Sequence, residues 1–331
     1  MTDAGMTDAD ALALAIEAAA LWGGAGPGTP RLIANRENAV FEVVLPTAAQ
    51  AALRLHRVGY QSDAAIGSEL WLVRELARHG VPVPLPLATL AGGLVADLGQ
   101  GRRASVLLWA EGEAIGQARV PLAQSPAEQG RIYHALGRLL AGLHSAADRL
   151  EVPPGFTRPD WGTDGLVGEA PFWGRFWQHP GLRADERQVM LAARGYCRDR
   201  LAGFAHGDHG VIHADVLREN VLVDGDALTL IDFDDCGTGF RLYDLGTALS
   251  QSLAEPHLAA IAAALIGGYS ALRPLDAVAR AMVPVFVLLR TLASVGWTMP
   301  RLPPDHPSAR AHIDRAVRAA RIVLAGGDLL A

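Results

Sequence analysis

Four polar residues near the middle of the chain stand where short apolar runs end. The run VIH ends at His213, and Asp215 and Asn220 lie between this run and the next one. The following runs are NVLV and LTLID, and the second run ends at Asp232. The residues between them begin with an Asp-Gly pair (224–225), which is a β-hairpin signal. The spacing therefore predicts that Asp215, Asn220 and Asp232 face one cleft at the ends of neighbouring strands.

Carboxylate and amide oxygens are ligands that suit hard divalent cations such as Mg²⁺. Asn220 and Asp232 are the candidate metal ligands, which leaves Asp215 to accept a proton from an attacking hydroxyl group. Phosphoryl transfer needs this combination, because metal ions neutralise phosphate charge while a base aligns the attacking oxygen. The residue types and their order thus favour a kinase-type reaction.

The motif HADVLREN (213–220), followed by the strand end IDF (231–233), resembles the catalytic and metal-binding motifs of the protein-kinase-like fold. A chance His-x-Asp-x4-Asn is common, whereas one followed at this distance by an Ile-Asp-Phe-Asp strand end is specific. Within that fold, the segment IDFDDCGTGFRLYDLGTAL (231–249) is similar to the aminoglycoside phosphotransferase, choline kinase and type II homoserine kinase group, and in particular to its stress-response kinase branch.

This resemblance covers residues 30–300 and implies ATP and Mg²⁺ as cofactors, with Asp215 as the catalytic base. It also implies a two-lobed α+β fold of the protein-kinase-like type. A small antiparallel-sheet lobe with one helix, residues 1–108, anchors the nucleotide. A larger and mainly helical lobe, residues 109–331, carries the catalytic and metal loops.

The secondary-structure pattern agrees with this division. Five β-like runs within residues 30–109 surround a helix predicted at 62–80, which has Ser62 as its N-cap and its apolar residues on one face. Helical patterns dominate afterwards: the segment 125–147 opens with a capping box and a proline in its first turn, and another helix is predicted at 183–204. A mostly β lobe is therefore followed by a helical lobe.

A second phrase, HGD at 206–208, also occurs in the catalytic loops of aminoglycoside kinases. The residue five positions after Asp208 is His213 and not asparagine, and no strand follows at the required place. We therefore assign the base to Asp215 and treat Asp208 as part of a polar lead-in loop. Metal binding by His206, His209 and His213 is the alternative, although their spacing matches no strong zinc pattern.

The small lobe of such kinases usually holds ATP phosphates with a strand lysine paired to a helix glutamate. This chain has no lysine, so all 29 Lys+Arg residues are arginine. Strand alternation puts Arg54 at the position of that lysine, and Glu69 in the following helix is the matching partner. The resemblance implies that Arg54 contacts ATP phosphates and that Glu69 orients it. A solvent-exposed ion pair without such a role is the alternative.

Other nucleotide contacts rest on weaker signals. The turn NREN (35–38), with Asn38, offers polar groups that would cover the phosphates, but it also fits an ordinary hairpin turn. The fold resemblance implies that adenine lies against the connector, with Leu107 and Trp109 as contacts. The alternative for Leu107 is a plain position in the core of a strand.

The acceptor side has three candidate residues. Asp234 and Asp235 follow the metal-binding aspartate and would bind a second cation or a cationic substrate group, or form a solvated acidic turn. Trp173, in the aromatic segment 156–182, would stack on a substrate or box an ammonium group, or pack this segment on the core. Asp244 is expected to cap the next helix and to brace the catalytic loop.

Composition narrows the function classes. The chain of 331 residues has a net charge of −6 and a pI near 6.0, which argues against an extended nucleic-acid surface. Its two cysteines form neither a disulfide framework nor a zinc pattern. The N-terminal stretch is acidic where a secretory signal is basic, and the apolar stretch 281–297 contains Arg290. We therefore expect no membrane span and a cytoplasmic location.

We expect an ATP- and Mg²⁺-dependent phosphotransferase that acts on the hydroxyl group of a small molecule, such as an amino alcohol, homoserine or an aminoglycoside. One alternative is a Ser/Thr protein kinase of the stress-response type, with a protein as its substrate. Another is a catalytically silent nucleotide-binding regulator, because Arg54 replaces the usual lysine. A metal hydrolase that uses the histidines is the third alternative. The oligomeric state stays open.

Overall fold

The computed structural model describes residues 6–24, 26, 28–35, 38–204 and 207–331. The chain forms two compact units. The first contains Met1–Glu113 together with the later segments Leu150–Arg158 and Leu222–Ile231, and the second contains the remainder. The predicted boundary after residue 108 differs from this division, because contacts and not chain order decide which segments pack together.

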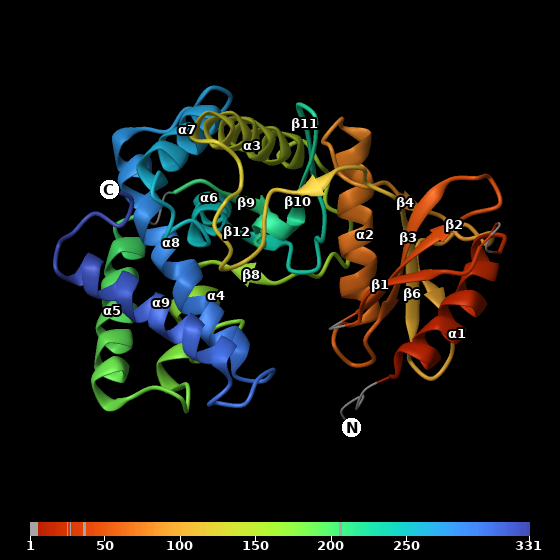
Figure 1. The fold of residues 1–331 in the computed structure, drawn as a ribbon, viewed down its shortest axis with the longest axis horizontal. Helices are drawn as coiled ribbons and strands as arrows, with labels where there is room; N and C mark the ends of the chain where they lie inside the picture. The colour runs from red at the N-terminus through yellow and green to blue at the C-terminus, as the bar shows by residue number, and fades with distance from the viewer. Residues whose placement is uncertain (1–5, 25, 27, 36–37, 205–206) are drawn as a thin grey trace. The chain divides into compact units, whose positions relative to one another are not determined.

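The first unit is built on an antiparallel sheet with the strand order β1-β2-β3-β6-β4, and β5 pairs with β6 (Figure 1). The strands are β1 (Arg31–Asn35), β2 (Ala39–Val44), β3 (Gln50–His56), β4 (Pro86–Leu87), β5 (Ala96–Asp97) and β6 (Arg103–Leu108). The predicted strands are therefore present, and the proline-rich segment VPVPLPL adds one more. Pro86 is tolerated there because β4 is an edge strand.

Two helices accompany this sheet. Helix α1 (Asp8–Ala19) begins after the N-cap Thr7, and its alanine face packs in one buried cluster with Phe41, Leu53 and Val106. Helix α2 (Asp63–Arg78) has the predicted N-cap, Ser62, whose Oγ accepts a hydrogen bond from the Ala65 N–H.

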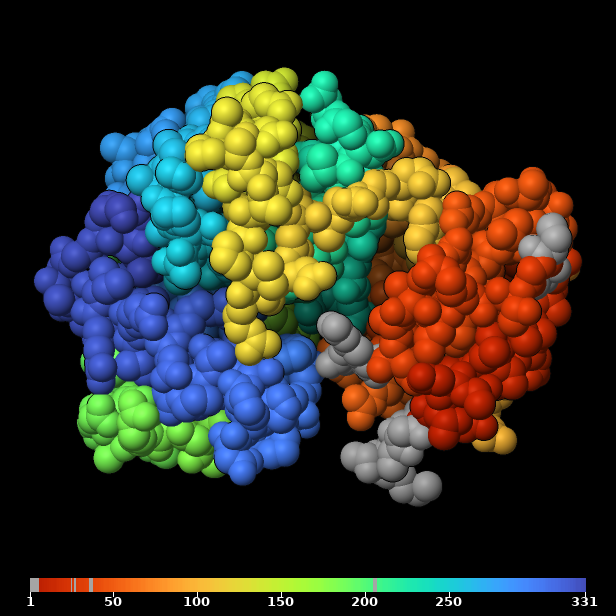
Figure 2. Space-filling view, in the orientation of Figure 1, coloured from red at the N-terminus to blue at the C-terminus, as the bar shows by residue number. Residues whose placement is uncertain are grey.

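The second unit is mainly helical. Its helices are α3 (Pro126–Ala147), α4 (Thr163–Val167), α5 (Ala184–Ala202), α6 (Leu242–Ser250), α7 (Leu258–Ser270), α8 (Ala277–Thr298) and α9 (Pro307–Leu324). The predicted capping box of α3 is present, with Ser125 and Glu128 each accepting a backbone N–H of the other. In Figure 2, the last helix, α9, contributes to the visible surface of this unit.

Short strands carry the polar loops. In one small sheet, β12 (Gly237–Phe240) pairs antiparallel with β9 (His209–Ile212) and parallel with β8 (Asp160–Trp161). A second sheet has the order β11-β10-β7, with β7 (Glu113–Ala114), β10 (Val221–Asp224) and β11 (Ala227–Leu230). The predicted pairing of NVLV with LTLID is thus confirmed, and a two-residue turn joins the strands.

Among the described residues, α8 is the one helix that is long and apolar enough to cross a membrane by length and composition, and 72% of its apolar window is buried within the protein. Arg290 in its centre is 4% exposed and contacts polar residues of the second unit. The helix therefore fits the expected role of a core helix.

Candidate active site

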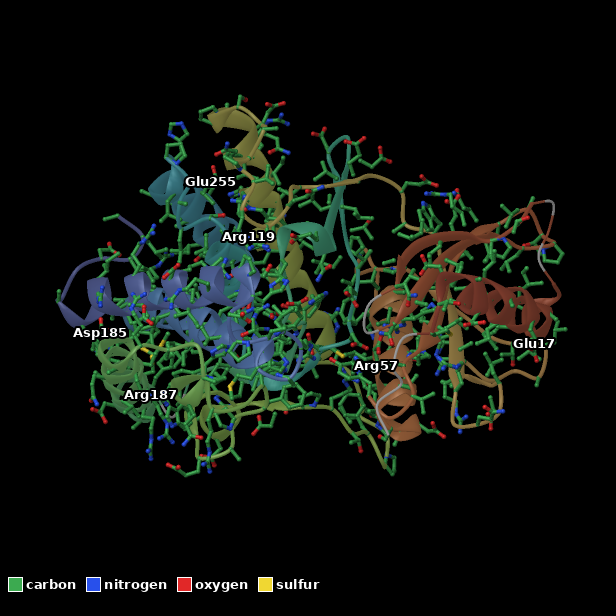
Figure 3. The ribbon with its side chains drawn as sticks, turned by 60° about the horizontal axis from the view of Figure 1, so that its bottom comes forward. Glu17, Arg57, Arg119, Asp185, Arg187 and Glu255 are labelled. Atoms are coloured by element: carbon green, nitrogen blue, oxygen red, sulfur yellow. The ribbon has the colours of Figure 1, made fainter. Side chains whose placement is uncertain are left out.

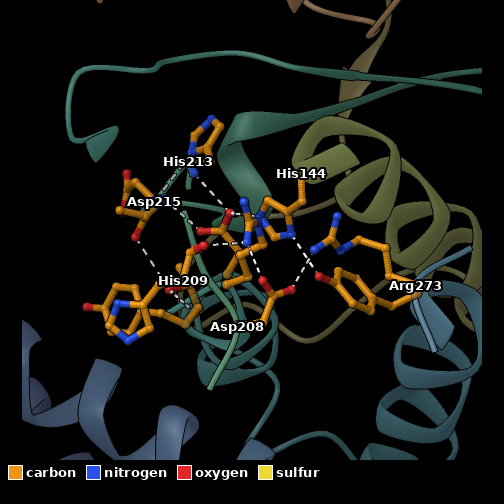
Figure 4. Close-up of polar contacts among 12 residues, drawn as sticks. His144, Asp208, His209, His213, Asp215 and Arg273 are labelled. Atoms are coloured by element: carbon orange, nitrogen blue, oxygen red, sulfur yellow. Dashed lines mark hydrogen bonds and ion pairs between the residues drawn. The ribbon is translucent and has the colours of Figure 1, made fainter. Parts of the chain in front are cut away.

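A buried carboxylate, that of Asp244, holds the loop that carries Asp215. Asp244 accepts the backbone N–H groups of His213 at 2.9 Å and Ala214 at 2.7 Å. Asp244 also contacts His144 Nε2 at 3.0 Å, and both side chains are fully buried. Figure 4 labels two partners of Asp244, His144 and His213. The expected bracing role of Asp244 is confirmed. Its expected N-cap role is wrong, because α6 begins earlier, after the N-cap Arg241, and the carboxylate is used by the loop instead.

This bracing holds an unfavourable backbone conformation. Ala214 has φ of 65°, in the left-handed region that a non-glycine residue rarely adopts. Such a conformation costs about 1–3 kcal/mol and persists where its surroundings over-determine it. The two hydrogen bonds to Asp244 supply that constraint, and the Asp215 N–H donates to His213 Nδ1 at 3.2 Å. The side chain of Asp215 is consequently presented in one direction.

Both oxygens of the Asp215 carboxylate have partners. Asn220 Nδ2 donates to Asp215 Oδ2 and to the Asp215 carbonyl, each at 2.9 Å. Arg290 donates to Asp215 Oδ1 at 2.6 Å. The structure thus brings Asp215 and Asn220 together, as the motif predicted.

Arg290 is a site residue that the motif did not reveal. Its guanidinium also donates to Ser294 Oγ at 2.9 Å and lies 4.6 Å from the ring centroid of Trp173. A usable signal was present, because an arginine in the middle of the most apolar stretch must be paired when it is buried. Trp173 packs edge to face on Trp161 at 4.9 Å, so its ring lies between the core and the guanidinium.

The acidic residues after β11 concentrate negative charge beside Asp215. Burial raises the pKa of Asp235 well above its usual range, and the charges of Asp215, Asp234 and Asp232 add to this, while Arg290 opposes it. The backbone carbonyl of Asp235 accepts the Trp161 Nε1–H at 2.9 Å, which ties the turn to the core. This concentration of carboxylates is the environment that a bound cation neutralises.

The donor set fits Mg²⁺. Because Asn220 Nδ2 is used by Asp215, the amide oxygen is the group that Asn220 offers to a ligand. Asp232 is exposed, and its φ of 63° is a second left-handed backbone position at this site. An amide and a carboxylate oxygen leave most coordination positions to water and phosphate, as Mg²⁺ prefers.

Asp208, the aspartate of the segment HGD (206–208), forms ion pairs that link neighbouring elements. Asp208 pairs with Arg241 and, at 2.6 Å, with Arg273, and both arginines also pair with Asp148 (Figure 4). Burial would raise the pKa of Asp208, but the hydrogen bond from Arg273 and the charge of Arg241 outweigh it and lower the pKa. Among the described residues, no group of three His, Cys, Asp or Glu side chains is placed to hold a metal ion, and His206 lies outside them.

In the first unit, Arg54 and Glu69 form the predicted pair. Their side chains are 9% and 1% exposed, so the alternative of a solvent-exposed ion pair is wrong. Arg54 lies on β3 opposite Val40 and Ser105 of the neighbouring strands. The next residue on that face, His56, contacts Ser105 Oγ at 2.9 Å, and burial followed by the charge of Arg54 lowers its pKa well below the usual value.

The remaining nucleotide candidates are held by backbone contacts. Asn38 Oδ1 accepts the backbone N–H of Arg57 at 3.2 Å; Figure 3 labels Arg57. Leu107 lies between Ala52 and Pro86 in the sheet, so its backbone faces neighbouring strands. The Trp109 N–H donates to the Gln50 carbonyl at 3.0 Å, which leaves its carbonyl as the backbone group to offer adenine. The proposed contacts of Asn38, Leu107 and Trp109 with the nucleotide stay predictions.

Known proteins share both sequence and fold with this chain. Residues 29–281 match the phosphotransferase enzyme family. A homoserine kinase from Chelativorans sp. (strain BNC1) is 34% identical over 229 residues, which is 65% of this chain and 63% of that protein. The match thus spans less than two thirds of the length of that relative.

Two solved structures extend the comparison. The structure of a microcompartment-associated aminopropanol kinase superposes with a TM-score of 0.82 at 29% identity, covering 96% of this chain and 99% of the other. An amicoumacin kinase in complex with AMP-PNP, Ca²⁺ and Ami shows the same fold with a TM-score of 0.76 at 20% identity, covering 96% and 94%.

These matches include both motif loops and both units. The resemblance inferred from the motif pair is therefore confirmed, and so is the α+β fold with an N-terminal antiparallel sheet and a helical C-terminal part. The chain belongs to the phosphotransferase enzyme family.

Proposed function

We propose that this protein is an ATP- and Mg²⁺-dependent phosphotransferase that moves the γ-phosphate to a hydroxyl group of a small molecule. One observation carries the proposal: in a chain of this family, the Asp215 carboxylate is held by Asn220 on one oxygen and by Arg290 on the other. A carboxylate has about four lone-pair sites, so two hydrogen bonds leave room for a substrate hydroxyl.

In the proposed reaction, Asp215 accepts the proton of the acceptor hydroxyl group while the oxygen of that hydroxyl group attacks the γ-phosphorus. The bond between that phosphorus and the bridging oxygen of the β-phosphate breaks, and ADP leaves. Asn220 and Asp232 hold Mg²⁺, which neutralises phosphate charge when bound. Arg54, oriented by Glu69, contacts the phosphates with its planar guanidinium in place of a lysine ammonium.

A small-molecule acceptor is supported by the named activities of the relatives, which are kinases of homoserine, aminopropanol and amicoumacin. The AMP-PNP and Ca²⁺ in the amicoumacin kinase complex support a nucleotide and a divalent cation as ligands. We also propose a cytoplasmic location, where ATP is available to the enzyme.

The decisive experiment measures ADP release from MgATP with a panel of hydroxylated metabolites and generic protein acceptors. Asp215→Asn is expected to lower turnover by about 10²- to 10⁴-fold, because it removes the base but keeps the shape. Asp305→Asn, an exposed loop aspartate, is the matched control and should keep full activity.

The outcome separates the candidates. Phosphate on one metabolite, lost in Asp215→Asn, supports the proposal. Phosphate on protein acceptors alone would instead favour the protein kinase. AMP-PNP binding without turnover on any acceptor would favour a silent regulator and make the replacement of lysine by Arg54 its cause.

A further inference from the structure

Basic side chains gather around Arg290, the partner of Asp215, in the second unit. Arg290 lies on α8, His312 and Arg315 lie on α9, and Arg119 lies in the loop before α3. Helices α8 and α9 pack on each other, and Arg119 reaches the start of α9, where it contacts Ser308 Oγ at 3.4 Å (Figure 3). We call Arg119, His312 and Arg315 the basic cluster.

The charges of this cluster and of Arg290 act on one another. Burial, followed by the charges of Arg290 and Arg119, lowers the pKa of Arg315 to about 10 against the opposing charge of Glu219. Burial, followed by the charges of Arg315, Arg290 and Arg119, lowers the pKa of His312 to about 3. His312 is therefore neutral at physiological pH, and it contacts an Arg315 nitrogen at 2.9 Å.

Arg315 is half-buried, and it lacks the counter-ion that the buried arginines have. Arg54, Arg218 and Arg241 each pair with at least one carboxylate. Among the described residues, no carboxylate lies within ion-pairing distance of Arg315 or Arg119, and Arg315 Nε is buried without a hydrogen-bond partner. A partly buried charge without a counter-ion is costly, so Arg315 favours an anion from outside the chain, and the exposed Arg119 adds a second positive charge.

The carboxylate that acts on Arg315 is already engaged elsewhere. Glu219 accepts the Ala118 N–H on one oxygen and the Gln251 side-chain amide on the other. Arg290 is committed to Asp215. The two guanidinium groups that remain for an anionic ligand are those of Arg119 and Arg315.

We propose that the acceptor alcohol carries an anionic group, a carboxylate or a phosphate, which Arg315 and Arg119 bind while its hydroxyl faces Asp215. This inference rests on the proposed function, because it assigns the substrate side of the same site. Arg290 connects the two parts, since it contacts Asp215 and its charge acts on Arg315. The substrates for which the relatives are named differ in this group: homoserine has a carboxylate and aminopropanol has none.

The test compares acceptors that differ by one anionic group. The pairs are threonine with 1-aminopropan-2-ol and homoserine with 3-aminopropan-1-ol; glycerate and glycerol 3-phosphate are each compared with glycerol. For at least one pair, kcat/KM of the wild-type protein is expected to be about tenfold or more higher with the anionic member. A ratio of this size corresponds to one hydrogen bond to a charged group. The glycerol series tells carboxylate from phosphate.

Variants locate the effect. Arg315→Gln is expected to raise KM for the preferred anionic acceptor by about tenfold or more with kcat nearly unchanged, and to leave the neutral partner of that pair unaffected. Arg119→Gln should act in the same direction. Arg318→Gln, an exposed arginine on the same helix, is the matched control and should change neither acceptor.

Calorimetry with the same acceptors, on protein saturated with MgAMP-PNP, separates this inference from the proposed function. Transfer to neutral alcohols alone, or an equal effect of Arg315→Gln on both members of a pair, would overturn the inference and keep the function. Binding of anionic acceptors that depends on Arg315, without any transfer, would support the inference and reject the function. If Arg315→Gln weakens AMP-PNP binding instead, the cluster serves nucleotide phosphates and the inference is wrong.

Discussion

Asn220 and Arg290 both hold the Asp215 carboxylate, and their effects differ. Asn220 bonds to the side chain and to the backbone carbonyl of Asp215, so it sets the position of the side chain within its own loop. Arg290 comes from a core helix and adds a positive charge. A charge-assisted hydrogen bond from a guanidinium to a carboxylate is stronger than a neutral one, so Arg290 fixes the direction of the second oxygen.

We predict that Arg290→Met lowers kcat by about 10- to 100-fold, because a misplaced base loses alignment with the attacking hydroxyl. Arg290→Lys should restore part of kcat, because it keeps a cationic donor beside Asp215. Arg280→Met, an exposed arginine on the same helix, is the control; a kcat unchanged in Arg290→Met would contradict the positioning role.

The Arg54–Glu69 pair can be tested apart from its structural role. Removing one partner leaves a buried charge unpaired, which typically costs about 3–5 kcal/mol, whereas replacing both partners with apolar residues is often neutral. The double variant Arg54→Met/Glu69→Leu should therefore keep the melting temperature near that of the wild type and lose AMP-PNP affinity by about tenfold or more, as expected for lost charged hydrogen bonds. Calorimetry and thermal unfolding measure the two effects.

Arg54→Lys adds the reverse test. It restores the lysine of related kinases and should keep most of the AMP-PNP affinity. Arg57→Met, at the end of the same strand, serves as the control. Full nucleotide affinity in the folded double variant would show that the pair is structural only.

Among the helices, the contact between α3 and α7 depends on a glycine. A Cβ at Gly268 would overlap the backbone carbonyl of His134 on α3, so no other residue fits without separating the helices. The neighbouring Gly267 has open space around its Cβ position. This pair of adjacent glycines offers an internal control for the packing of the two helices.

We predict that Gly268→Ala destabilises the protein by about 3 kcal/mol or more, because the clash is with backbone and not with a flexible side chain. Gly267→Ala should instead be neutral or stabilise by up to about 1 kcal/mol, since alanine loses less backbone entropy in a helix. Urea unfolding of both variants measures the difference. Equal stability of the two variants would contradict the close approach of α3 and α7.

For the protein as a whole, ligand binding and stability are linked. A ligand that binds only the folded chain stabilises it by about 2.7 kcal/mol at one hundred times its dissociation constant. We predict that AMP-PNP with Mg²⁺ raises the melting temperature by several degrees and that EDTA removes most of this increase. Asp232→Asn should remove the Mg²⁺-dependent part, while Asp305→Asn should keep it. A shift in Asp232→Asn as large as in the wild type would reject Asp232 as a metal ligand.

Much of the fold and the centre of the site could be predicted from the sequence, because their signals are local. The capping box at Ser125, the hairpin before Asp232 and the short spacing from Asp215 to Asn220 depend on residues a few positions apart. The pairing of Arg54 with Glu69 was predicted from the family resemblance, with strand alternation placing Arg54 at the position of the usual lysine.

Contacts between distant segments were decided by the tertiary structure. Arg290 reaches Asp215 across 75 residues, and His144 reaches Asp244 across 100 residues. The basic cluster forms because α8, α9 and the loop of Arg119 pack together. A short motif contains the groups that take part in the reaction. The charges that surround those groups depend on which helix faces are in contact, and the packing of the whole unit determines these contacts.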